Sequence, residues 1–262
     1  MAKILLSFDT EEFDVPREHG VEISLDESMK ISIAGTNSIL DVLLKHGVKA
    51  TFFCTSNFVE NAPDVMRRII DEGHEVAAHG CDHWQPKPTD VARSKEIIER
   101  LTGVTVHGYR QPRMFPVSNE EIARCGYVYN SSLNPAFIPG RYMHLTDPRT
   151  FFMKDGILQI PAAVTPIARF PLFWLSYHHL PAGLYRRLAK RVANHDGYFA
   201  TYFHPWEFFD LSSRPDLKMP YLIRHNSGAN MADRLSELIA YFKQSRDEFV
   251  TYYEFAKSVI SK

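Results

Sequence analysis

The sequence has few cysteines and no long hydrophobic run. Its three cysteines, Cys54, Cys81 and Cys125, include no pair at CxxC spacing, which leaves a zinc–thiolate knuckle or a redox pair without support. No stretch reaches the roughly 18 uninterrupted apolar residues of a membrane span. The apolar run at residues 4–6 is too short for a signal peptide. We therefore expect a cytoplasmic protein with free thiols.

Charge of one sign is also missing. The 262 residues include 30 basic and 31 acidic side chains, a formal net charge of −1, which disfavours binding to nucleic acid. Hydrophobic residues make up 45% of the chain, enough for a sizeable core, so disorder is not expected. No repeat, low-complexity tract or linker divides the chain, and we predict one domain over residues 1–262.

Short apolar segments alternate with segments of helical character. The strand-like segments are residues 3–8, 48–56, 74–79, 106–112, 127–132, 157–161, 198–205 and 248–255. The helical ones are residues 28–46, 63–72, 89–101, 118–124, 180–193 and 231–242. Six or more βα units predict a parallel sheet with helices outside it. Because polar residues follow several strands, at Asp9, His79, Arg110 and His204, a closed or nearly closed barrel fits best.

Two short motifs offer ligands for a metal. The loop His79-Gly-Cys-Asp-His83 has two histidines four apart, and imidazole is a good ligand for zinc and its neighbours. The spacing alone leaves a surface pair of histidines as an equal alternative. The segment Ser-Phe-Asp9-Thr-Glu11-Glu12 follows a buried strand, and two residues of extended chain place Asp9 and Glu11 on one side. Alone, that segment reads as an ordinary acidic loop.

Two further motifs carry an arginine and a third histidine. Arg110 follows a strand and is suited to bridge a carboxylate, or to form a surface salt bridge. His204 is followed by Pro205, which stiffens the turn, and by Trp206, an aromatic wall for a sugar or a core residue. The aromatic segment 170–187 favours a core helix, with a membrane-surface contact as the alternative.

In this order the four motifs resemble the polysaccharide deacetylase family, also called the NodB-homology or carbohydrate esterase 4 family. The resemblance extends from Asp9 to His204 and implies a distorted (β/α)7-type barrel. It looks closest to a variant branch whose first motif is acid–spacer–acid and whose late motif is HPWE. The family's usual first-motif glycine is absent, and Asn130 stands where that branch often has Asp. The acid that usually supports the motif arginine is therefore left unassigned, with Asp196 as one candidate.

The resemblance implies a division of roles among these residues. A divalent metal, zinc before cobalt, nickel or iron, would be held by Glu11, His79 and His83 and would activate a water molecule. The remaining assignments are a general base at Asp9, a supporting cation at Arg110, a general acid at His204, and substrate contacts at Trp206, Pro112 and Tyr109.

The implied function is removal of N-acetyl groups from amino sugars in a polysaccharide, an oligosaccharide or a lipid-linked glycan. A lipid-linked substrate would place the protein at the inner face of the membrane. Two alternatives remain at this point. One is a carbon–nitrogen hydrolase of the same fold that opens a small cyclic amide or ureide, as allantoinase does. The other is a carbohydrate-binding protein without activity. The oligomeric state has no signal in the sequence.

Overall fold

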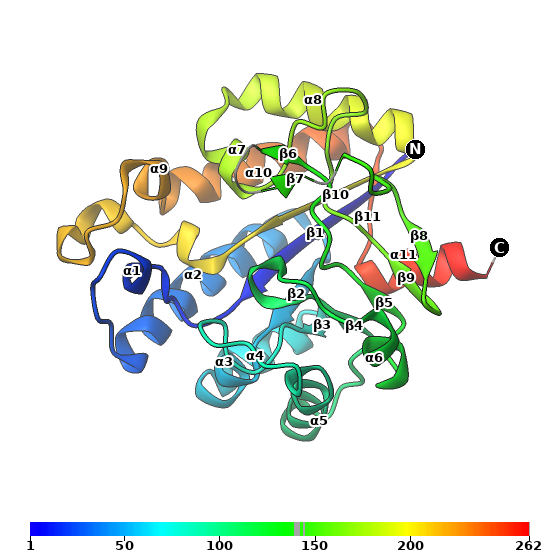
Figure 1. Cartoon of the computed structure of the whole chain (residues 1–262). Helices are drawn as coiled ribbons and strands as arrows, with labels where there is room; N and C mark the ends of the chain where they lie inside the picture. Colours follow the sequence, from blue (N-terminus) through cyan, green and yellow to red (C-terminus); the bar gives the residue numbers. More distant parts are fainter. Residues whose placement is uncertain (139–141, 144, 262) are drawn as a thin grey trace.

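A computed structural model describes residues 1–138, 142–143 and 145–261 and shows a curled parallel sheet surrounded by helices (Figure 1). Seven parallel strands follow one another around the sheet. In spatial order they are β10 (Tyr198–Phe203), β1 (Lys3–Thr10), β2 (Thr51–Cys54), β3 (Glu75–Ala78), β4 (Gly108–Tyr109), β5 (Tyr129–Asn130) and β9 (Ile157–Gln159). The predicted distorted (β/α)7-type barrel is thereby confirmed.

The barrel has a weak seam between its first and last parallel strands. Strands β9 and β10 share no ladder, but beyond β9 the amide of Ala163 donates to the carbonyl of Ala200 at 2.8 Å. Four further short strands lie outside this run of seven among the described residues. They are β8 (Phe152–Lys154), antiparallel to β9; β11 (Glu248–Phe249), parallel to β1; and β6 (Phe137–Ile138) with β7 (Tyr142–Met143), which pair antiparallel in a separate sheet.

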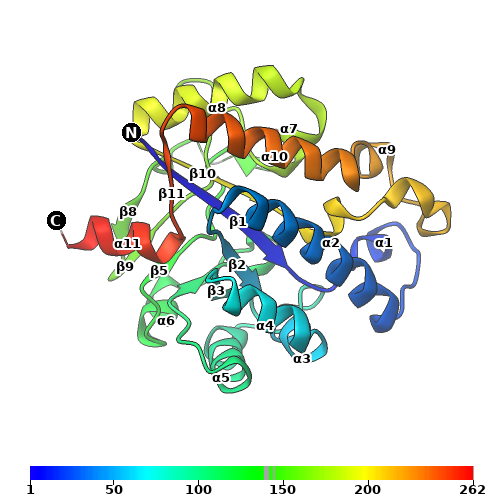
Figure 2. The same cartoon turned by 180° about the vertical axis from the view of Figure 1, so that it is seen from behind.

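Helices cover the outside of the barrel, as Figures 1 and 2 show. One flank carries α3 (Ser56–Asn61), α4 (Pro63–Asp71), α5 (Asp90–Thr102) and α6 (Asn119–Arg124), and the other carries α7 (Trp174–His179), α8 (Ala182–Asp196) and α10 (Ala229–Gln244). The long helix α2 (Leu25–His46) packs against the 3-10 turn η2 (Pro205–Phe208). The remaining short elements are α1 (Val15–Glu18), η1 (Pro112–Met114), η3 (Leu211–Ser213), η4 (Pro215–Leu217) and α9 (Tyr221–Arg224). No helix of the described residues is long and apolar enough to span a membrane.

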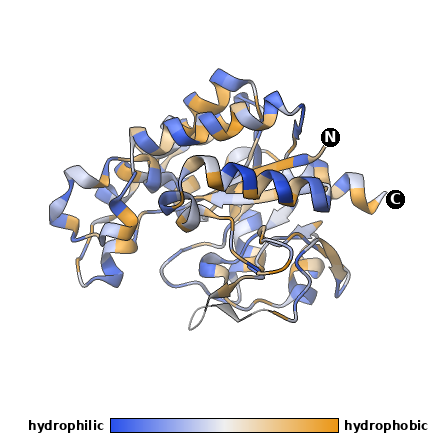
Figure 3. Ribbon diagram, turned by 90° about the horizontal axis from the view of Figure 1, so that it is seen from above, coloured by the Kyte–Doolittle hydropathy of each residue, from blue (hydrophilic) through white to orange (hydrophobic). Residues whose placement is uncertain are grey.

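Alternate residues of each strand enter two different cores, because successive side chains point to opposite faces. On β1, Ile4, Leu6 and Phe8 pack under the outer helices, whereas Leu5 joins the barrel interior. The helices show the matching pattern, with hydrophobic residues toward the sheet and hydrophilic residues outside (Figure 3). Inside the barrel, Tyr252 of α11 (Tyr252–Ile260) packs on Phe53, with 5.5 Å between ring centroids. Helix α11 therefore fills the end of the barrel opposite the strand ends that carry polar residues.

The C-terminal segment differs from the prediction. Residues 248–255 were expected to form one strand, but the strand ends at Phe249 and a helix begins at Tyr252. The reason is a capping box, in which the Thr251 hydroxyl accepts from the Glu254 amide and Glu254 accepts from the Thr251 amide. Alternating aromatic residues hid this signal, although Thr-x-x-Glu stands in the sequence.

The aromatic segment 170–187 belongs largely to the core. Phe173, Tyr177 and Tyr185 are buried beneath the sheet-covering helices, and only Leu184 and Phe170 among its large hydrophobic side chains are exposed. The prediction of a core helix therefore holds for most of residues 170–187. The burial of these side chains does not support the alternative of a membrane-surface contact.

Candidate metal and catalytic site

The end of β1 aims two carboxylates at the mouth of the barrel. Asp9 lies on the interior face of the strand, two residues beyond Ser7, whose hydroxyl reaches the inward-facing Tyr252 at 3.5 Å. Glu11 follows two residues later and continues the same side. Both carboxylates are almost fully buried, at 3% and 1% exposure. Buried carboxylates are costly unless something compensates their charge, so each needs a partner.

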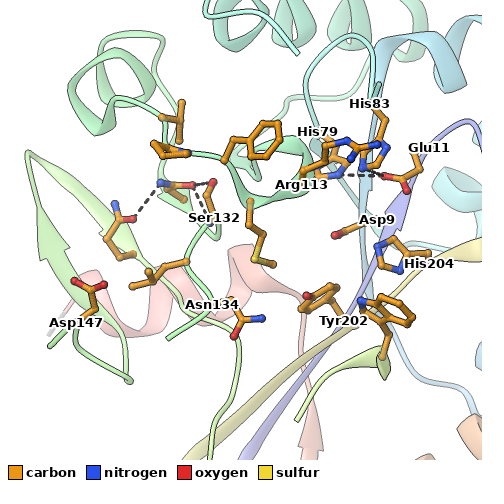
Figure 4. A pocket seen from close by; sticks show the side chains of 18 of the residues that line it. Asp9, Glu11, His79, His83, Arg113, Ser132, Asn134, Asp147, Tyr202 and His204 are labelled. Atoms are coloured by element: carbon orange, nitrogen blue, oxygen red, sulfur yellow. Dashed lines mark hydrogen bonds and ion pairs between the residues drawn. The ribbon is translucent and has the colours of Figure 1, made fainter. Parts of the chain in front are cut away.

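Glu11, His79 and His83 converge on one point. Glu11 Oε2 lies 3.3 Å from His79 Nε2 and 3.2 Å from His83 Nε2, and the three ligand atoms lie within 4.8 Å of one another. His79 follows β3, and the positive φ of Gly80, 72°, turns the chain so that His83 returns to the same place. Figure 4 shows the three side chains facing one another.

The outer nitrogens of both histidines already have acceptors. His79 Nδ1 is 2.8 Å from the Arg110 carbonyl oxygen, and His83 Nδ1 is 2.8 Å from Asp14 Oδ2. A neutral imidazole that donates at Nδ1 has a lone pair at Nε2. Two such lone pairs then face Glu11 Oε2, which has no hydrogen-bond donor among the described residues. This arrangement of donors fits a divalent cation, and the outer acceptors are those that orient metal-bound histidines.

Charge shifts at the cluster agree with a site built around a cation. Burial raises the pKa of Glu11 to about 8, although His83 and His204 act in the opposite direction. Burial lowers the pKa of His79 to about 4, which keeps its imidazole neutral. For His83 burial is outweighed by Glu11 and Asp14, and its pKa rises to about 9. A proton on His83 thus supplies positive charge that a bound cation would otherwise bring.

Neighbouring acids hold the loop of the cluster in place. Glu12 is buried, accepts from the Thr55 hydroxyl at 2.8 Å and from the His83 amide at 3.0 Å, and therefore has a structural role. Asp82 caps the loop by accepting from the Gln85 amide at 2.7 Å. The carboxylate behind the His83 ring is that of Asp14 and not that of Asp82.

Asp9 is paired with Arg110, which is completely buried. The Arg110 guanidinium donates to Asp9, to the Ser131 carbonyl at 3.2 Å and to the Ser131 hydroxyl at 2.9 Å, and lies 3.9 Å above the Phe53 ring. Burial alone would raise the pKa of Asp9, but the charges of Arg110, His79 and His204, with the hydrogen bond from Arg110, together outweigh it and hold that pKa below its ordinary value. Asp9 is consequently a carboxylate kept ionised inside the protein.

His204 faces the cavity from the end of β10 and belongs to a buried chain of polar groups. Its Nδ1 is 2.9 Å from Glu207 Oε1, and the other oxygen of Glu207 is 2.9 Å from His178 Nε2. His178 Nδ1 lies 2.6 Å from the His225 carbonyl oxygen. Both nitrogens of His178 thus face oxygen acceptors. Burial would raise the pKa of Glu207, but its hydrogen bonds to the two rings lower it.

Aromatic side chains surround His204. Trp206 stacks on it with 4.9 Å between ring centroids, and Trp174 and Tyr202 meet it edge-on at 5.4 Å and 5.8 Å. All three line the cavity at the mouth of the barrel, whose volume is about 650 Å³. The indole nitrogen of Trp206 is buried and has no partner among the described residues. These rings give the cavity an apolar wall beside the histidine.

The structure brings together most, but not all, of the residues selected from the sequence. Trp206 lines the cavity, whereas Tyr109 and Pro112 do not. Tyr109 is fully buried and donates to Gln111 Oε1 at 2.7 Å, because its position on β4 turns it into the outer core. Asp196 pairs with Arg149 instead of Arg110, so it is not the acid sought for the motif arginine.

Several functional candidates were missed by sequence reasoning. Glu207 had a signal, because it stands three residues after His204 in the HPWE motif, the spacing of a helix cap. Asp14 and His178 had none, since their partners come from other segments of the chain. The asparagines that line the cavity were also missed, and only Asn130 was noted.

Comparisons with known proteins agree with this architecture. The family model for polysaccharide deacetylase matches residues 15–127. The chitooligosaccharide deacetylase of Rhizobium leguminosarum bv. trifolii is 46% identical over 138 residues, which cover 51% of this chain and 60% of that protein. The chain spans between 32% and 60% of the length of three curated relatives that it matches.

Solved structures extend the likeness to the whole fold. A Mycobacterium smegmatis protein assigned to the polysaccharide deacetylases has a TM-score of 0.67 at 20% identity, covering 99% of this chain and 90% of that one. PuuE allantoinase has a TM-score of 0.66 at 16% identity, with 97% and 89% covered. At these identities the likeness establishes the shared barrel and not the reaction. Sequence and fold together relate the chain to the polysaccharide deacetylase family, as its motifs predict.

Proposed function

We propose that residues 1–262 form one catalytic domain that hydrolyses the N-acetyl group of an amino sugar within a glycan. One observation carries this proposal. Three ligand atoms, from Glu11, His79 and His83, converge beside an ionised carboxylate, Asp9, in a cavity that a histidine, His204, also lines. Metal-assisted hydrolysis of an amide needs these groups: a cation site, a base for water and an acid for the leaving amine.

The metal site fits a small divalent cation. Glu11, His79 and His83 would hold it, and two imidazoles with one carboxylate are a donor set typical of catalytic zinc, which makes zinc the first choice. When bound, such a cation lowers the pKa of a water ligand and polarises a carbonyl oxygen. Three protein ligands leave room for water and for substrate.

The protein's own residues supply the proton transfers. Asp9, held ionised by Arg110, takes a proton from the attacking water as general base. His204 protonates the departing amine, because an unprotonated amine is a poor leaving group. Glu207 fixes the imidazole of His204 with its proton on Nδ1 and stabilises the ring when it is charged. The products are acetate and a free amino sugar.

The cavity bears on the substrate class. A volume of about 650 Å³ lies within the roughly 300–1,000 Å³ of sites for drug-sized ligands, and it exceeds what a small cyclic ureide fills. Two relatives are named peptidoglycan deacetylase and chitooligosaccharide deacetylase, and each of these names gives a glycan of amino sugars as the substrate. Both observations favour a glycan over the ureide alternative. The complete set of acid, base and ligand residues argues against an inactive binding protein.

Acetate release tests the proposal. Zinc-loaded protein would be incubated with N-acetylglucosamine oligomers and, separately, with allantoin, beside the Asp9→Asn variant and the matched control Asp64→Asn, whose carboxylate is exposed on α4. We expect acetate from the sugars with wild type and with the control, and a loss of at least about 100-fold with Asp9→Asn. Ring opening of allantoin without acetate would refute the glycan assignment. No turnover of any substrate by protein that binds zinc would refute the activity.

A further inference from the structure

The cavity extends beyond the reaction centre to a second end lined with amide side chains. Asn119, Asn130, Asn134 and Gln159 line this region together with Ser132. In Figure 4 Asn134 and Ser132 lie across the open space from Asp9 and the metal ligands. None of these five side chains enters the chemistry assigned above. The proposed mechanism therefore leaves this part of the cavity without a purpose.

Most members of this group satisfy one another. Asn130 Nδ2 donates to Asn119 Oδ1 and to Gln159 Oε1, each at 3.1 Å, and Asn130 Oδ1 accepts from the Ser132 amide at 3.1 Å. The Ser132 hydroxyl in turn accepts from the Gln111 amide at 2.9 Å. These bonds tie the loop after β5 to β9 and to the loop after β4. They give the second end of the cavity a rigid, polar floor.

Asn134 is the exception. Its side chain is only 2% exposed, yet among the described residues neither Oδ1 nor Nδ2 has a hydrogen-bond partner. Leaving one buried polar group unpaired costs roughly 1–3 kcal/mol, and nearly all such groups in native proteins are paired. The side chain lines the cavity, so a ligand can reach it. A buried, unpaired amide that faces a cavity is the expected signature of a group kept for a ligand.

The backbone holds Asn134 in place before any ligand binds. The Leu133 carbonyl accepts from the Ala162 amide at 2.9 Å, which ties the segment to the chain after β9. Pro135 follows directly and restricts the backbone of Asn134 to extended conformations. The amide is thus presented on a fixed support, which lowers the entropy that binding would cost.

We propose that Asn134 forms a subsite for the sugar unit next to the one that is deacetylated, and that it pairs with the acetamido group of that unit. This inference rests on the proposed function. An acetamido group has one N–H donor and one carbonyl acceptor, and the free amide of Asn134 has the complementary acceptor and donors. The subsite makes an oligosaccharide with at least two N-acetylated units the preferred substrate. A single N-acetylglucosamine reaches only the reaction centre.

Kinetics with the Asn134→Leu variant test the subsite, because leucine is similar in size and cannot form hydrogen bonds. We expect kcat/KM for the N-acetylglucosamine dimer to fall at least about tenfold, with kcat/KM for the monomer unchanged. Zinc content should equal that of wild type. The melting temperature should not fall, because no bond within the described protein is lost. Asn61→Leu, an exposed position on α3, is the matched control and should change neither substrate's kinetics.

Binding gives a second readout that does not depend on turnover. Calorimetry on the zinc-loaded Asp9→Asn protein would compare the dimer with disaccharides in which one unit is glucose instead of N-acetylglucosamine. We expect the addition of Asn134→Leu to Asp9→Asn to lower the affinity for the dimer about tenfold. Of the two glucose disaccharides, the one that binds more weakly should have the same affinity for both proteins. If glucose replaces either unit without loss of affinity, acetamido recognition is refuted.

The two proposals fail in different ways. If wild type releases acetate from oligomers but Asn134→Leu treats monomer and dimer as wild type does, the subsite is refuted and the deacetylase function stands. If wild type releases no acetate from any sugar and the Asp9→Asn protein binds none, the proposed function is refuted, and the subsite with it. A fall in melting temperature with equal losses on monomer and dimer would make Asn134 a structural residue and also refute the subsite.

Discussion

Removing the Arg110 guanidinium, which pairs with Asp9, should show how much the buried ion pair of Arg110 and Asp9 contributes to stability. Arg110→Met deletes a guanidinium with 0% exposure and leaves Asp9, 3% exposed, without its counter-charge. Breaking a buried ion pair by removing one partner typically costs about 3–5 kcal/mol. For a chain of this length each kcal/mol lowers the melting temperature by roughly 2–4 °C. We therefore expect a drop of about 6–20 °C for the metal-free protein at neutral pH.

The cost should depend on Asp9 and not merely on lost packing. Asp9→Asn alone should cost less, because Arg110 keeps its bonds to Ser131 and its contact with the Phe53 ring. In the double variant no orphaned carboxylate remains, so the two losses should not add. A double-mutant cycle by calorimetry, run in a chelator, should give a coupling free energy of about 1–3 kcal/mol. A coupling below about 0.5 kcal/mol would refute the view that the pair is energetically linked.

The same variant also predicts a change in pH dependence. Arg110 holds the pKa of Asp9 below its ordinary value, so Asp9 remains ionised down to low pH in wild type. Burial raises the pKa of Asp9, and the charge of Arg110 is the largest effect that lowers it. Without Arg110 the pKa of Asp9 therefore rises. The acidic limb of the kcat/KM profile should accordingly move to higher pH in Arg110→Met. An unmoved acidic limb with measurable activity would show that Asp9 is not the base.

Three other residues and one glycine give shorter tests. Glu11→Gln should lose zinc, measured by emission spectroscopy, and with it the rise in melting temperature that zinc gives wild type. Glu207→Gln should lower kcat about 10–100-fold at unchanged zinc content, since His204 loses the acceptor that orients it. Burial lowers the pKa of His74 from 6.5 to about 4, so its contribution to stability is present above pH 6.5 and is lost as pH falls toward 4; His74→Gln should flatten that decline in denaturant titrations. Gly35→Ala should lower the free energy of unfolding by at least about 1–3 kcal/mol, because the added methyl group would lie 1.8 Å from the carbonyl oxygen of Pro205.

Local patterns were enough to predict most of the fold. The predicted helix over residues 28–46 is observed as Leu25–His46 and is ended by Gly47, whose φ of 61° is the left-handed conformation that glycine favours. The strand ends that carry Asp9, His79, Arg110 and His204 could be predicted because parallel strands deliver their carboxyl ends to one mouth. The weak point was residues 248–255, where alternating aromatics mimic a strand although a capping box starts a helix.

The site was less predictable because its supporting contacts come from distant segments. Asp14 reaches His83 across 69 residues, and His178 reaches Glu207 across 29. No short motif encodes such a pairing. The free amide of Asn134 is also invisible in the sequence, since its significance lies in what it fails to contact. Motifs of a few residues locate reactive groups, whereas burial and partners decide what each group can do.

The arrangement of charge around the reaction centre follows a consistent logic. The carboxylate of Asp9, the proposed base, contacts the buried guanidinium of Arg110. The imidazole of His204, the proposed acid, contacts the buried carboxylate of Glu207. Arg110 favours the carboxylate that the proposed mechanism requires at Asp9, and Glu207 Oε1 lies 2.9 Å from Nδ1 of His204. The two groups also stand on adjacent strands, because Phe8 of β1 pairs with Phe203 of β10. The hydrogen-bonded ladder of the sheet therefore fixes how far base and acid lie apart, and a one-residue slip of either strand would turn its own reactive side chain away from the cavity.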